Sequence, residues 1–203
     1  MSLKVGGIVL CGGESRRMGR PKAWLSFGDE FMLQRVVRIL RAVVEPIVVV
    51  GAPDQDLPPL EPPVELVHDQ RRSRGPLEGL AAGLSRMAQL GADAAYASST
   101  DVPFLQPSFV QRMIELLGDA LIAVPHAEDK HHPLAAVYRT AVLPEIDRLL
   151  AVDRLRPLFL FDAVPTRVVK SDELQAADPT FQSLRNLNTP DEYTAALKDA
   201  GLE

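Results

Sequence analysis

Short apolar runs alternate along the chain with longer stretches in which apolar residues recur at helical spacing. Several runs are continuously apolar, which is typical of parallel strands covered on both faces. The predicted strands are residues 5–10, 47–51, 64–67, 94–98, 121–124, 134–138 and 166–169. The stretches between them predict helices over residues 32–44, 77–90 and 109–117. This alternation predicts an α/β fold, a three-layer sandwich with a mainly parallel, Rossmann-like sheet.

Three segments between these elements carry other signals. Residues 58–63 are rich in proline and predict a rigid surface connection. Residues 153–161 predict a short helix interrupted by Pro157. Near the C-terminus, Thr189 predicts a helix N-cap, with Pro190 at the first helical position and Glu192 completing a capping box.

Length and composition limit the class of protein. At 203 residues, 46% hydrophobic and 24% charged, the chain predicts a single globular domain over residues 1–203. Its net charge of −5 argues against a nucleic-acid partner, because phosphate backbones favour basic surfaces. The single cysteine, Cys11, excludes an intrachain disulfide and is expected to be a small packed residue. No signal peptide or membrane-spanning run is found, so we expect a cytoplasmic protein without a membrane partner.

The segment after the first predicted strand carries the strongest chemical signal. Gly12 and Gly13 allow a sharp turn that presents backbone N–H groups, and Arg16, Arg17 and Lys22 follow. This pattern predicts a loop that holds a nucleoside triphosphate. The spacing fits neither a Walker A loop nor a dinucleotide fingerprint. An ordinary strand-to-helix turn with solvated arginines is the alternative.

Acidic residues follow two other predicted strands. Asp101 closes one strand just before Pro103, and Asp69 follows His68 at the end of another. The carboxyl ends of parallel strands share one edge of a sheet, where ligands bind. Mg²⁺ prefers a few carboxylate and phosphate oxygens together with water, so Asp101 is a candidate ligand. A turn or helix-cap role for this aspartate is the alternative.

The start of the second predicted helix combines Gly75 and Pro76. Proline suits the first helical turn, and free N–H groups there favour an anion or a polar nucleobase edge. Gly79 and Gly83 weaken the helix unless something approaches closely, and tight packing against the sheet is the structural explanation.

Two polar groups remain in the second half of the chain. Adjacent His131 and His132 cannot share one helix face and lack a third ligand nearby, so a zinc site is disfavoured and a histidine that contacts substrate is preferred. Asn186 and Asn188 precede the capped helix, and the cap gives no local reason for either amide.

Together these motifs resemble the molybdenum cofactor guanylyltransferase family across nearly the whole chain. The matching segments are L-C-G-G-x-S-R-R-M-G-R-P-K at 10–22, H-D at 68–69, R-G-P-L-E-G-L at 74–80, T-D-V-P at 100–103, H-P at 132–133 and N-L-N-T-P-D-E at 186–192. The first motif is shared by many nucleotidyltransferases, whereas its combination with G-P-L-x-G and N-x-N-T-P is more selective.

The resemblance implies a nucleotidyltransferase fold and transfer of GMP from GTP to molybdenum-bearing molybdopterin, with Mg²⁺ as cofactor and pyrophosphate as product. The nucleotide-binding residues it implies are Leu10, Cys11, Gly12, Gly13, Lys22, Gly51, Asp69, Gly75, Pro76, Leu77, Gly79 and Asp101. Asp101 would also hold the metal, while His132, Asn186 and Asn188 would face the pterin. We expect Arg17, Lys22 and Asp101 to be catalytic, by offsetting charge on the phosphates.

The chain departs from the family at two positions. Gly51 stands where relatives often carry an asparagine that contacts nucleotide, so a side-chain hydrogen bond is lost there unless the backbone substitutes. Cys11 replaces a usual alanine, which is a small-for-small exchange.

Two alternatives to this function stay open at the level of sequence. One is a cytidylyltransferase that acts on molybdopterin or on a sugar or polyol phosphate. The other is a non-catalytic protein that delivers cofactor to molybdoenzymes. Proteins that insert molybdopterin and molybdoenzyme chaperones are the protein partners that the resemblance implies.

Overall fold

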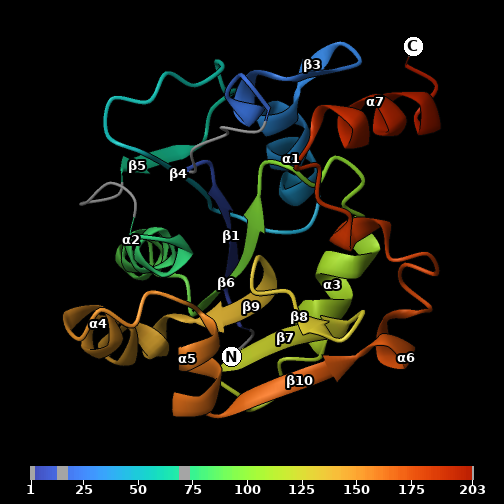
Figure 1. Ribbon diagram of the computed structural model, residues 1–203. Coiled ribbons are helices and arrows are strands. Elements are labelled where there is room, and N and C mark those ends of the chain that lie inside the picture. Colours follow the sequence, from blue (N-terminus) through green and yellow to red (C-terminus); the bar gives the residue numbers. More distant parts are fainter. Residues whose placement is uncertain (1–2, 13–17, 69–73, 203) are drawn as a thin grey trace.

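The computed structural model describes residues 3–12, 18–68 and 74–202 and centres on one large sheet (Figure 1). The strand order is β10-β7-β9-β6-β1-β4-β5, with β8 paired to β7. Its strands are β1 (Val5–Leu10), β4 (Ile47–Gly51), β5 (Glu65–His68), β6 (Ala94–Ser99), β7 (Ile122–Ala127), β8 (Lys130–His131), β9 (Ala135–Arg139) and β10 (Thr166–Lys170). A separate hairpin pairs β2 (Ser26–Phe27) with β3 (Glu30–Phe31).

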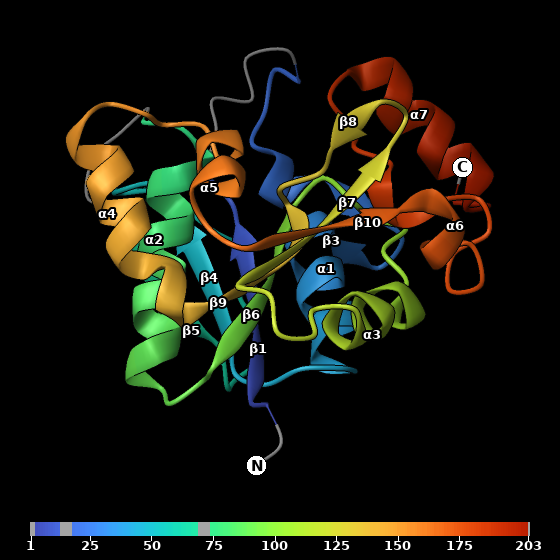
Figure 2. The ribbon, with the colours of Figure 1, turned by 90° about the horizontal axis from the view of Figure 1, so that it is seen from below.

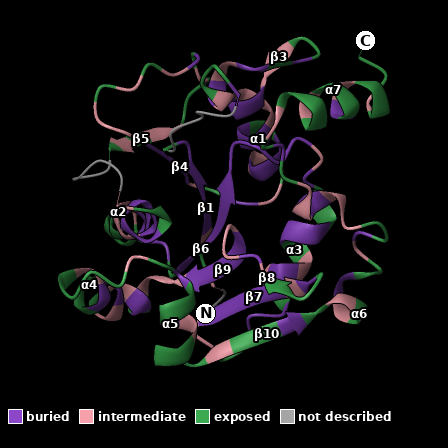
Figure 3. Cartoon of the chain, in the orientation of Figure 1, coloured by how far each residue is buried: buried purple, intermediate pink, exposed green. Residues whose placement is uncertain are grey.

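Helices cover both faces of the sheet, as the three-layer prediction requires. The helices are α1 (Met32–Arg41), α2 (Pro76–Gln89), α3 (Pro107–Glu115), α4 (Leu143–Ala151), α5 (Leu158–Ala163), α6 (Ser171–Leu174) and α7 (Pro190–Asp199), with 3₁₀ turns η1 (Lys22–Trp24), η2 (Thr140–Val142) and η3 (Gln182–Leu184). Figure 2 shows α2 and α4 on one side of the sheet and α1 and α3 on the other. Each face has its own buried apolar cluster, and the central strands are buried throughout most of their length (Figure 3).

The predicted strands are all present, and the mainly parallel sheet is confirmed. β9 is the exception among the central strands, because it runs antiparallel to both β6 and β7. The sequence pattern did not distinguish this direction. The connection from β7 to β9 is too short for a parallel crossover, which needs a dozen or more residues, so the chain must turn back on itself.

The prediction of a helix interrupted by Pro157 was wrong. α5 begins only after Pro157, which serves as its N-cap residue, and the backbone of Asp153 is left-handed with φ of 55°. A proline disfavours helical geometry in the residue before it, so it separates α5 from the preceding segment.

The carboxyl ends of four neighbouring strands meet at one edge of the sheet. Leu10 lies opposite both Val50 and Ser99, and Gly51 lies opposite His68. The loops that follow these strands are the segments in which the sequence placed its candidate nucleotide and metal residues. The prediction that they share an edge is therefore confirmed for the strand ends themselves.

Gly83 lets α2 lie close against β1. A Cβ atom built on Gly83 would stand 2.8 Å from Cγ2 of Ile8, closer than atoms can pack. The structural explanation offered for this glycine, tight packing against the sheet, is confirmed. Gly83 thus fixes the distance between α2 and the strand that leads into the first loop.

The proline-rich connection between β4 and β5 is tied to the adjoining layer by side chains. Gln34 Nε2 donates to Pro59 O at 2.8 Å, and Arg41 Nη1 donates to Glu61 O at 3.0 Å. Trp24 Nε1 donates to Asp56 O at 3.0 Å and packs edge-on against another aromatic ring. These bonds hold the loop that borders the β4 end of the sheet edge.

Candidate active site

Lys22 and Asp101 form an ion pair at the sheet edge. Lys22 Nζ lies 2.6 Å from Asp101 Oδ2, and their side chains are only 18% and 11% exposed. Lys22 opens η1 directly after the extended Pro21, while Asp101 follows β6. The structure therefore joins two residues that the sequence placed in separate motifs.

Both oxygens of the Asp101 carboxylate are engaged. Asp101 Oδ1 accepts hydrogen bonds from Ser99 Oγ at 2.5 Å and from Asn186 Nδ2 at 2.9 Å. Sequence reasoning missed Ser99 as a site residue. The signal was its position two residues before Asp101 at a strand end, where alternate residues share a face. Asp101 is thus held in one orientation before any ligand arrives.

The start of α7 positions the two asparagines. Asn188 Oδ1 accepts from Lys22 Nζ at 2.9 Å, and the backbone N–H of Leu187 donates to Asp101 O at 2.9 Å. These contacts supply the reason for Asn186 and Asn188 that the helix cap alone did not give. Residues that follow β10 in the sequence therefore join Lys22, from the loop after β1, and Asp101, from the loop after β6, in one group of contacting side chains.

The predicted capping box at Thr189 is confirmed and also fixes Asn188. Glu192 Oε2 accepts from the N–H of Asn188 at 2.6 Å and from the N–H of Thr189 at 3.0 Å. The bond from Asn188, with smaller help from Thr189 and Lys22, holds the pKa of the Glu192 carboxyl below its usual range. An ionised Glu192 therefore maintains the turn that presents Asn188 to Lys22.

The described part of the first loop continues β1 along the end of β4. Cys11 N donates to Val50 O at 2.8 Å, and Cys11 O accepts from Gln55 Nε2 at 3.2 Å. The Cys11 side chain is buried, and this burial raises the pKa of its thiol far above the usual value. The expectation of a small packed residue is confirmed, and Leu10 before it is buried as well.

Gln55 lies beside Gly51, where a Cβ atom would make an ordinary van der Waals contact with its amide. A Cβ atom on Gly51 would stand 3.6 Å from Gln55 Oε1, which accepts from Ala52 N at 2.8 Å. Gln55 therefore supplies an amide beside Gly51 and bonds it to the first loop. No periodic pattern in the sequence marks this loop glutamine, so sequence reasoning missed it.

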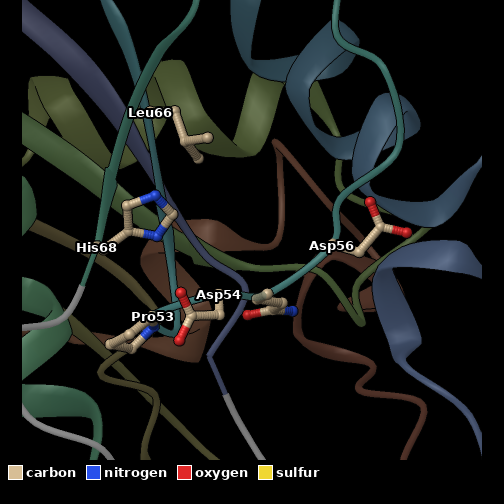
Figure 4. Close-up of a pocket in the computed structure, with 6 residues that line it drawn as sticks. Pro53, Asp54, Asp56, Leu66 and His68 are labelled. Atoms are coloured by element: carbon tan, nitrogen blue, oxygen red, sulfur yellow. The ribbon is translucent and has the colours of Figure 1, made fainter.

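An open pocket of about 650 Å³ adjoins Gln55 (Figure 4). Leu66 and His68 of β5 form one wall, and the loop carrying Pro53, Asp54 and Asp56 forms the other. His68 Nδ1 lies 3.2 Å from Ala52 O. The pocket thus follows the ends of β4 and β5 and has polar groups on both sides.

The N-terminus of α2 is set by Gly75 and Arg74. Gly75 has φ of 80° and ψ of 178°, and a Cβ there would stand 3.3 Å from Leu155 O, so only glycine fits. Arg74 Nη2 donates to Leu150 O and to Asp153 Oδ1, both at 2.8 Å. These bonds tie the helix start to the end of α4.

The residues that follow Gly75 differ in their access to a ligand. Pro76 is exposed at the first position of α2, while Leu77 and Gly79 are buried. The Leu77 side chain belongs to the apolar cluster between α2 and the sheet. Leu77 can therefore meet a ligand only through its backbone.

His132 and Asn186 line a second, smaller pocket of about 250 Å³. His132 is buried, with Nε2 3.3 Å from Ala127 O, and burial lowers the pKa of its imidazole. The structure therefore brings His132 and Asn186 to one pocket, whereas Asn188 lies on the Lys22 side.

Several predicted site residues lie outside the described part of the chain: Gly13, Arg16, Arg17 and Asp69. Gly12 is described and is exposed near the start of the first loop. Among the residues that the structure describes, no cluster of three or more histidine, cysteine or carboxylate side chains could hold a metal. In residues 3–12, 18–68 and 74–202, no helix has both the length and the apolar character of a membrane span.

Residues 7–166 match the family described as the MobA-like NTP transferase domain. A protein of Mycobacterium avium (strain 104), named "probable molybdenum cofactor guanylyltransferase", is 37% identical over 192 residues, covering 93% of this chain and 92% of that protein. The structure of molybdopterin-guanine dinucleotide biosynthesis protein A from Archaeoglobus fulgidus matches with a TM-score of 0.79 at 19% identity, covering 99% of this chain and 100% of that one. The 2-C-methyl-D-erythritol 4-phosphate cytidylyltransferase of Thermus thermophilus matches with a TM-score of 0.68 at 18% identity, with the same coverage. At these identities, the two structures share the fold of this chain.

Proposed function

Since the chain belongs to the MobA-like NTP transferase family and is therefore a nucleotidyltransferase, we propose that it transfers GMP from GTP to molybdenum-bearing molybdopterin. The products would be molybdopterin guanine dinucleotide and pyrophosphate. The similarity to a molybdenum cofactor guanylyltransferase over 93% of the chain supports this choice of substrates.

The observation that carries the proposal is the contact network of Lys22. Its ammonium group lies 2.6 Å from Asp101 Oδ2 and 2.9 Å from Asn188 Oδ1. The network joins the loop after β1, the end of β6 and the segment before α7 at one point of the sheet edge. A reaction between two phosphorylated substrates needs positive charge held at a point that both substrates reach, and a carboxylate at that point can hold a metal ion.

The donor set at Asp101 fits a magnesium ion. Asp101 is a single buried carboxylate, and Oδ2 receives one described hydrogen bond, from Lys22, which leaves it capacity for a metal. Mg²⁺ is typically held by one or two carboxylates together with substrate phosphates and water, rather than by a cage of protein ligands. When bound, Mg²⁺ would neutralise charge on the phosphate oxygens of GTP.

In the proposed reaction the protein positions the two substrates and neutralises charge on their phosphates, and it does not have to supply a general base. The terminal phosphate of the pterin attacks the α-phosphorus of GTP, and pyrophosphate leaves from the opposite side. A phosphate monoester is already ionised at neutral pH, so no side chain has to remove a proton. Lys22 offsets the charge on the phosphates, and Ser99 with Asn186 holds Asp101 in place. Arg17 is proposed to assist Lys22.

The remaining nucleotide contacts follow the ends of the parallel strands. We assign the triphosphate to residues 10–13 and Lys22, and further nucleotide contacts to Gly51 and Asp69. Guanine recognition falls to the first loop and residues 75–79. Gln55 supports the first loop through Cys11 O and places its amide beside Gly51. With GTP as donor, the reaction is proposed to run in the cytoplasm and to feed proteins that insert the cofactor into molybdoenzymes.

Thermal unfolding with each of GTP, CTP, ATP and UTP in the presence of Mg²⁺ tests the nucleotide. A ligand at 100 times its Kd stabilises the native state by about 2.7 kcal/mol, so GTP should raise the Tm and the others should not. Incubation with GTP and molybdenum-loaded molybdopterin should then release pyrophosphate. Absence of that release from well-folded protein would contradict the proposal.

A cytidylyltransferase is the competing function. The cytidylyltransferase fold matches this chain with a TM-score of 0.68, but at 18% identity that likeness concerns the fold alone. Calorimetric titration with GTP and with CTP separates the two functions, and a preference for CTP would favour the alternative. Membership of a nucleotidyltransferase family sets aside a non-catalytic delivery protein.

A further inference from the structure

The loop after β6 and the segment before α7 run side by side in opposite directions. Ser183 Oγ accepts from the N–H of Gln106 at 3.0 Å, and the N–H of Leu187 donates to Asp101 O at 2.9 Å. Gln106 is the N-cap residue of α3, beside which the segment runs in Figure 1. The two stretches of chain are therefore joined at both ends, and this pairing brings the two asparagines to the candidate site.

Arg185 joins the middle of the same two stretches. Its guanidinium carbon lies 5.1 Å from the centre of the Phe104 ring, and that ring packs edge-on against Phe27 with 5.6 Å between centroids. Arg185 Nη1 also lies 2.7 Å from Oδ2 of Asp199, the last residue of α7. The segment is thus fixed to the loop after β6 and to the helix that follows it.

Asp178 is a buried carboxylate, only 3% exposed, that takes no direct part in the proposed mechanism. Its Oδ1 accepts from the N–H of Gln182 at 3.1 Å, and its Oδ2 accepts from the N–H of Ser183 at 2.7 Å. These are N–H groups at the start of η3, which a helix leaves without partners of its own. Only two residues separate Ser183 from Asn186, so the carboxylate fixes the point from which the asparagine is placed.

The backbone of Phe181 shows why this turn needs the carboxylate. Phe181 has φ of 53° and ψ of 33°, a left-handed conformation that is disfavoured in a residue with a Cβ atom. It directs the chain from the turn after α6 into η3. The two hydrogen bonds to Asp178 follow immediately in the chain and offset the cost of this conformation.

Asp178 is itself held in place by the layer that contains α3. Its N–H donates to Leu174 O at 3.0 Å, and Leu174 is fully buried in the apolar cluster on that face of the sheet. Ser108 Oγ of α3 donates to Ala177 O at 2.7 Å. The carboxylate is therefore a fixed point relative to α3 and to the loop that leads into it.

We infer that Asp178 is a positioning residue for the Lys22–Asp101 centre, because its carboxylate sets the register of the segment before α7 along the loop after β6. This register keeps Asn186 on Asp101 Oδ1 and Asn188 on Lys22 Nζ. The inference rests on the proposed function and adds to it a residue outside the matched motifs. Being buried beneath η3, Asp178 acts through the two asparagines.

Hydrogen exchange of backbone amides tests the register without the reaction. D178N keeps the size of the side chain, but its amide NH₂ group cannot accept one of the two hydrogen bonds. The N–H of Leu187, which donates to Asp101 O, should exchange about tenfold faster in D178N than in the wild type. The N–H of Cys11 in the first loop should exchange at the same rate in both. D172N, at an exposed aspartate that also accepts a backbone N–H, is the matched control and should behave like the wild type.

Single-turnover transfer of GMP at excess enzyme tests whether the register matters for the reaction. D178N should lower the rate about tenfold in the otherwise wild-type chain. In a chain that already carries N186A and N188A, the same substitution should lower the rate less than about twofold, because the side chains through which Asp178 acts are gone. D172N should leave the rate unchanged in both backgrounds. An aspartate with a merely structural role would lower the rate by the same factor in both.

The outcomes separate this inference from the proposed function. Unchanged exchange at Leu187 in D178N, or an equal loss of rate in the two backgrounds, overturns the role of Asp178. If D178N does not fold, R185M decides, because it removes the contact with Phe104 and the bond to Asp199 from a partly exposed position. R185M should also speed exchange at Leu187, and unchanged exchange there overturns the pairing. Exchange needs no substrate, so a wild type that fails to transfer GMP contradicts the proposed function alone.

Discussion

The ammonium group of Lys22 and the carboxylate of Asp101 lie 2.6 Å apart, although 79 residues separate them in sequence. Each neutralises the other in a largely buried setting, so the pair holds the loop after β1 against the end of β6. When the substrates bind, a phosphate can replace Asp101 as the anionic partner of Lys22, and a magnesium ion can replace Lys22 as the cationic partner of Asp101. The pair can therefore exchange partners without an uncompensated charge.

Loss of either member should abolish transfer without unfolding the protein. We expect K22A and D101N to lower the rate of GMP transfer at least 100-fold, the magnitude seen when a preorganised charge-stabilising donor is removed. Steady-state pyrophosphate release measures the rate, and circular dichroism checks the fold. Lys198 lies exposed on α7, so K198A is the control and should keep the wild-type rate. Transfer by either site variant at the wild-type rate would remove it from the catalytic centre.

Replacement of Gln55 should weaken binding of GTP but leave binding of the acceptor unchanged. Q55M keeps the size of the side chain but loses the bond to Cys11 O and the bond from Ala52 N. We expect the KM for GTP to rise several-fold, because the first loop loses its support, while the KM for molybdopterin stays the same. Q175M, at an exposed glutamine, is the matched control. An unchanged KM for GTP would show that Gln55 does not support the loop.

Even a methyl side chain at position 83 should destabilise the native state. G83A should lower the free energy of unfolding by about 1–2 kcal/mol, because overpacking against Ile8 outweighs the helix propensity gained. S85A, at an exposed position of the same helix, gains propensity without the clash and should not destabilise. Urea unfolding measures both variants. In an I8A background the cost of G83A should shrink, and simple additivity would argue against direct contact.

His132 should make stability fall at mildly acid pH. Its pKa is lowered by burial, so the native state binds a proton less readily than the unfolded chain. The stabilisation that neutral His132 gives to the native state is therefore complete above the pKa of about 6.5 that the histidine has in the unfolded chain. It is lost as the pH falls through the lower pKa that the histidine has in the native state. We expect H132N to show a shallower loss of unfolding free energy between about pH 7 and 5 than the wild type. Parallel pH profiles for the two proteins would show that His132 is not the group responsible.

The sequence predicted the parallel part of the fold well because continuous apolar runs and glycine turns are local signals. The edge shared by Leu10, Gly51 and Asp101 followed from the general rule for carboxyl ends. The direction of β9 did not follow, because an apolar run has the same pattern in either direction. Connection length was the informative signal there.

Sequence reasoning identified a site residue only where the local secondary structure gave no reason for that residue. Asn186 and Asn188 stood out because the helix cap did not need them, and both contact the Lys22–Asp101 pair. Ser99 and Gln55 are ordinary residues for a strand end and a loop, and their roles depend on atoms brought close by the fold. Side-chain contacts between distant segments leave no periodic trace in a sequence.

The reversed direction of β9 separates the sheet into two parts with different loops at the site. β1, β4 and β5, which run in one direction, end in the loops to which we assign the nucleotide, whereas the turn that sends β9 back carries His131 and His132. Asp101 stands where the two halves meet. If the function proposed above holds, a chain built this way could exchange one acceptor for another through changes in the β7–β9 turn and the C-terminal segment, while the loops proposed to hold the nucleotide stay unchanged.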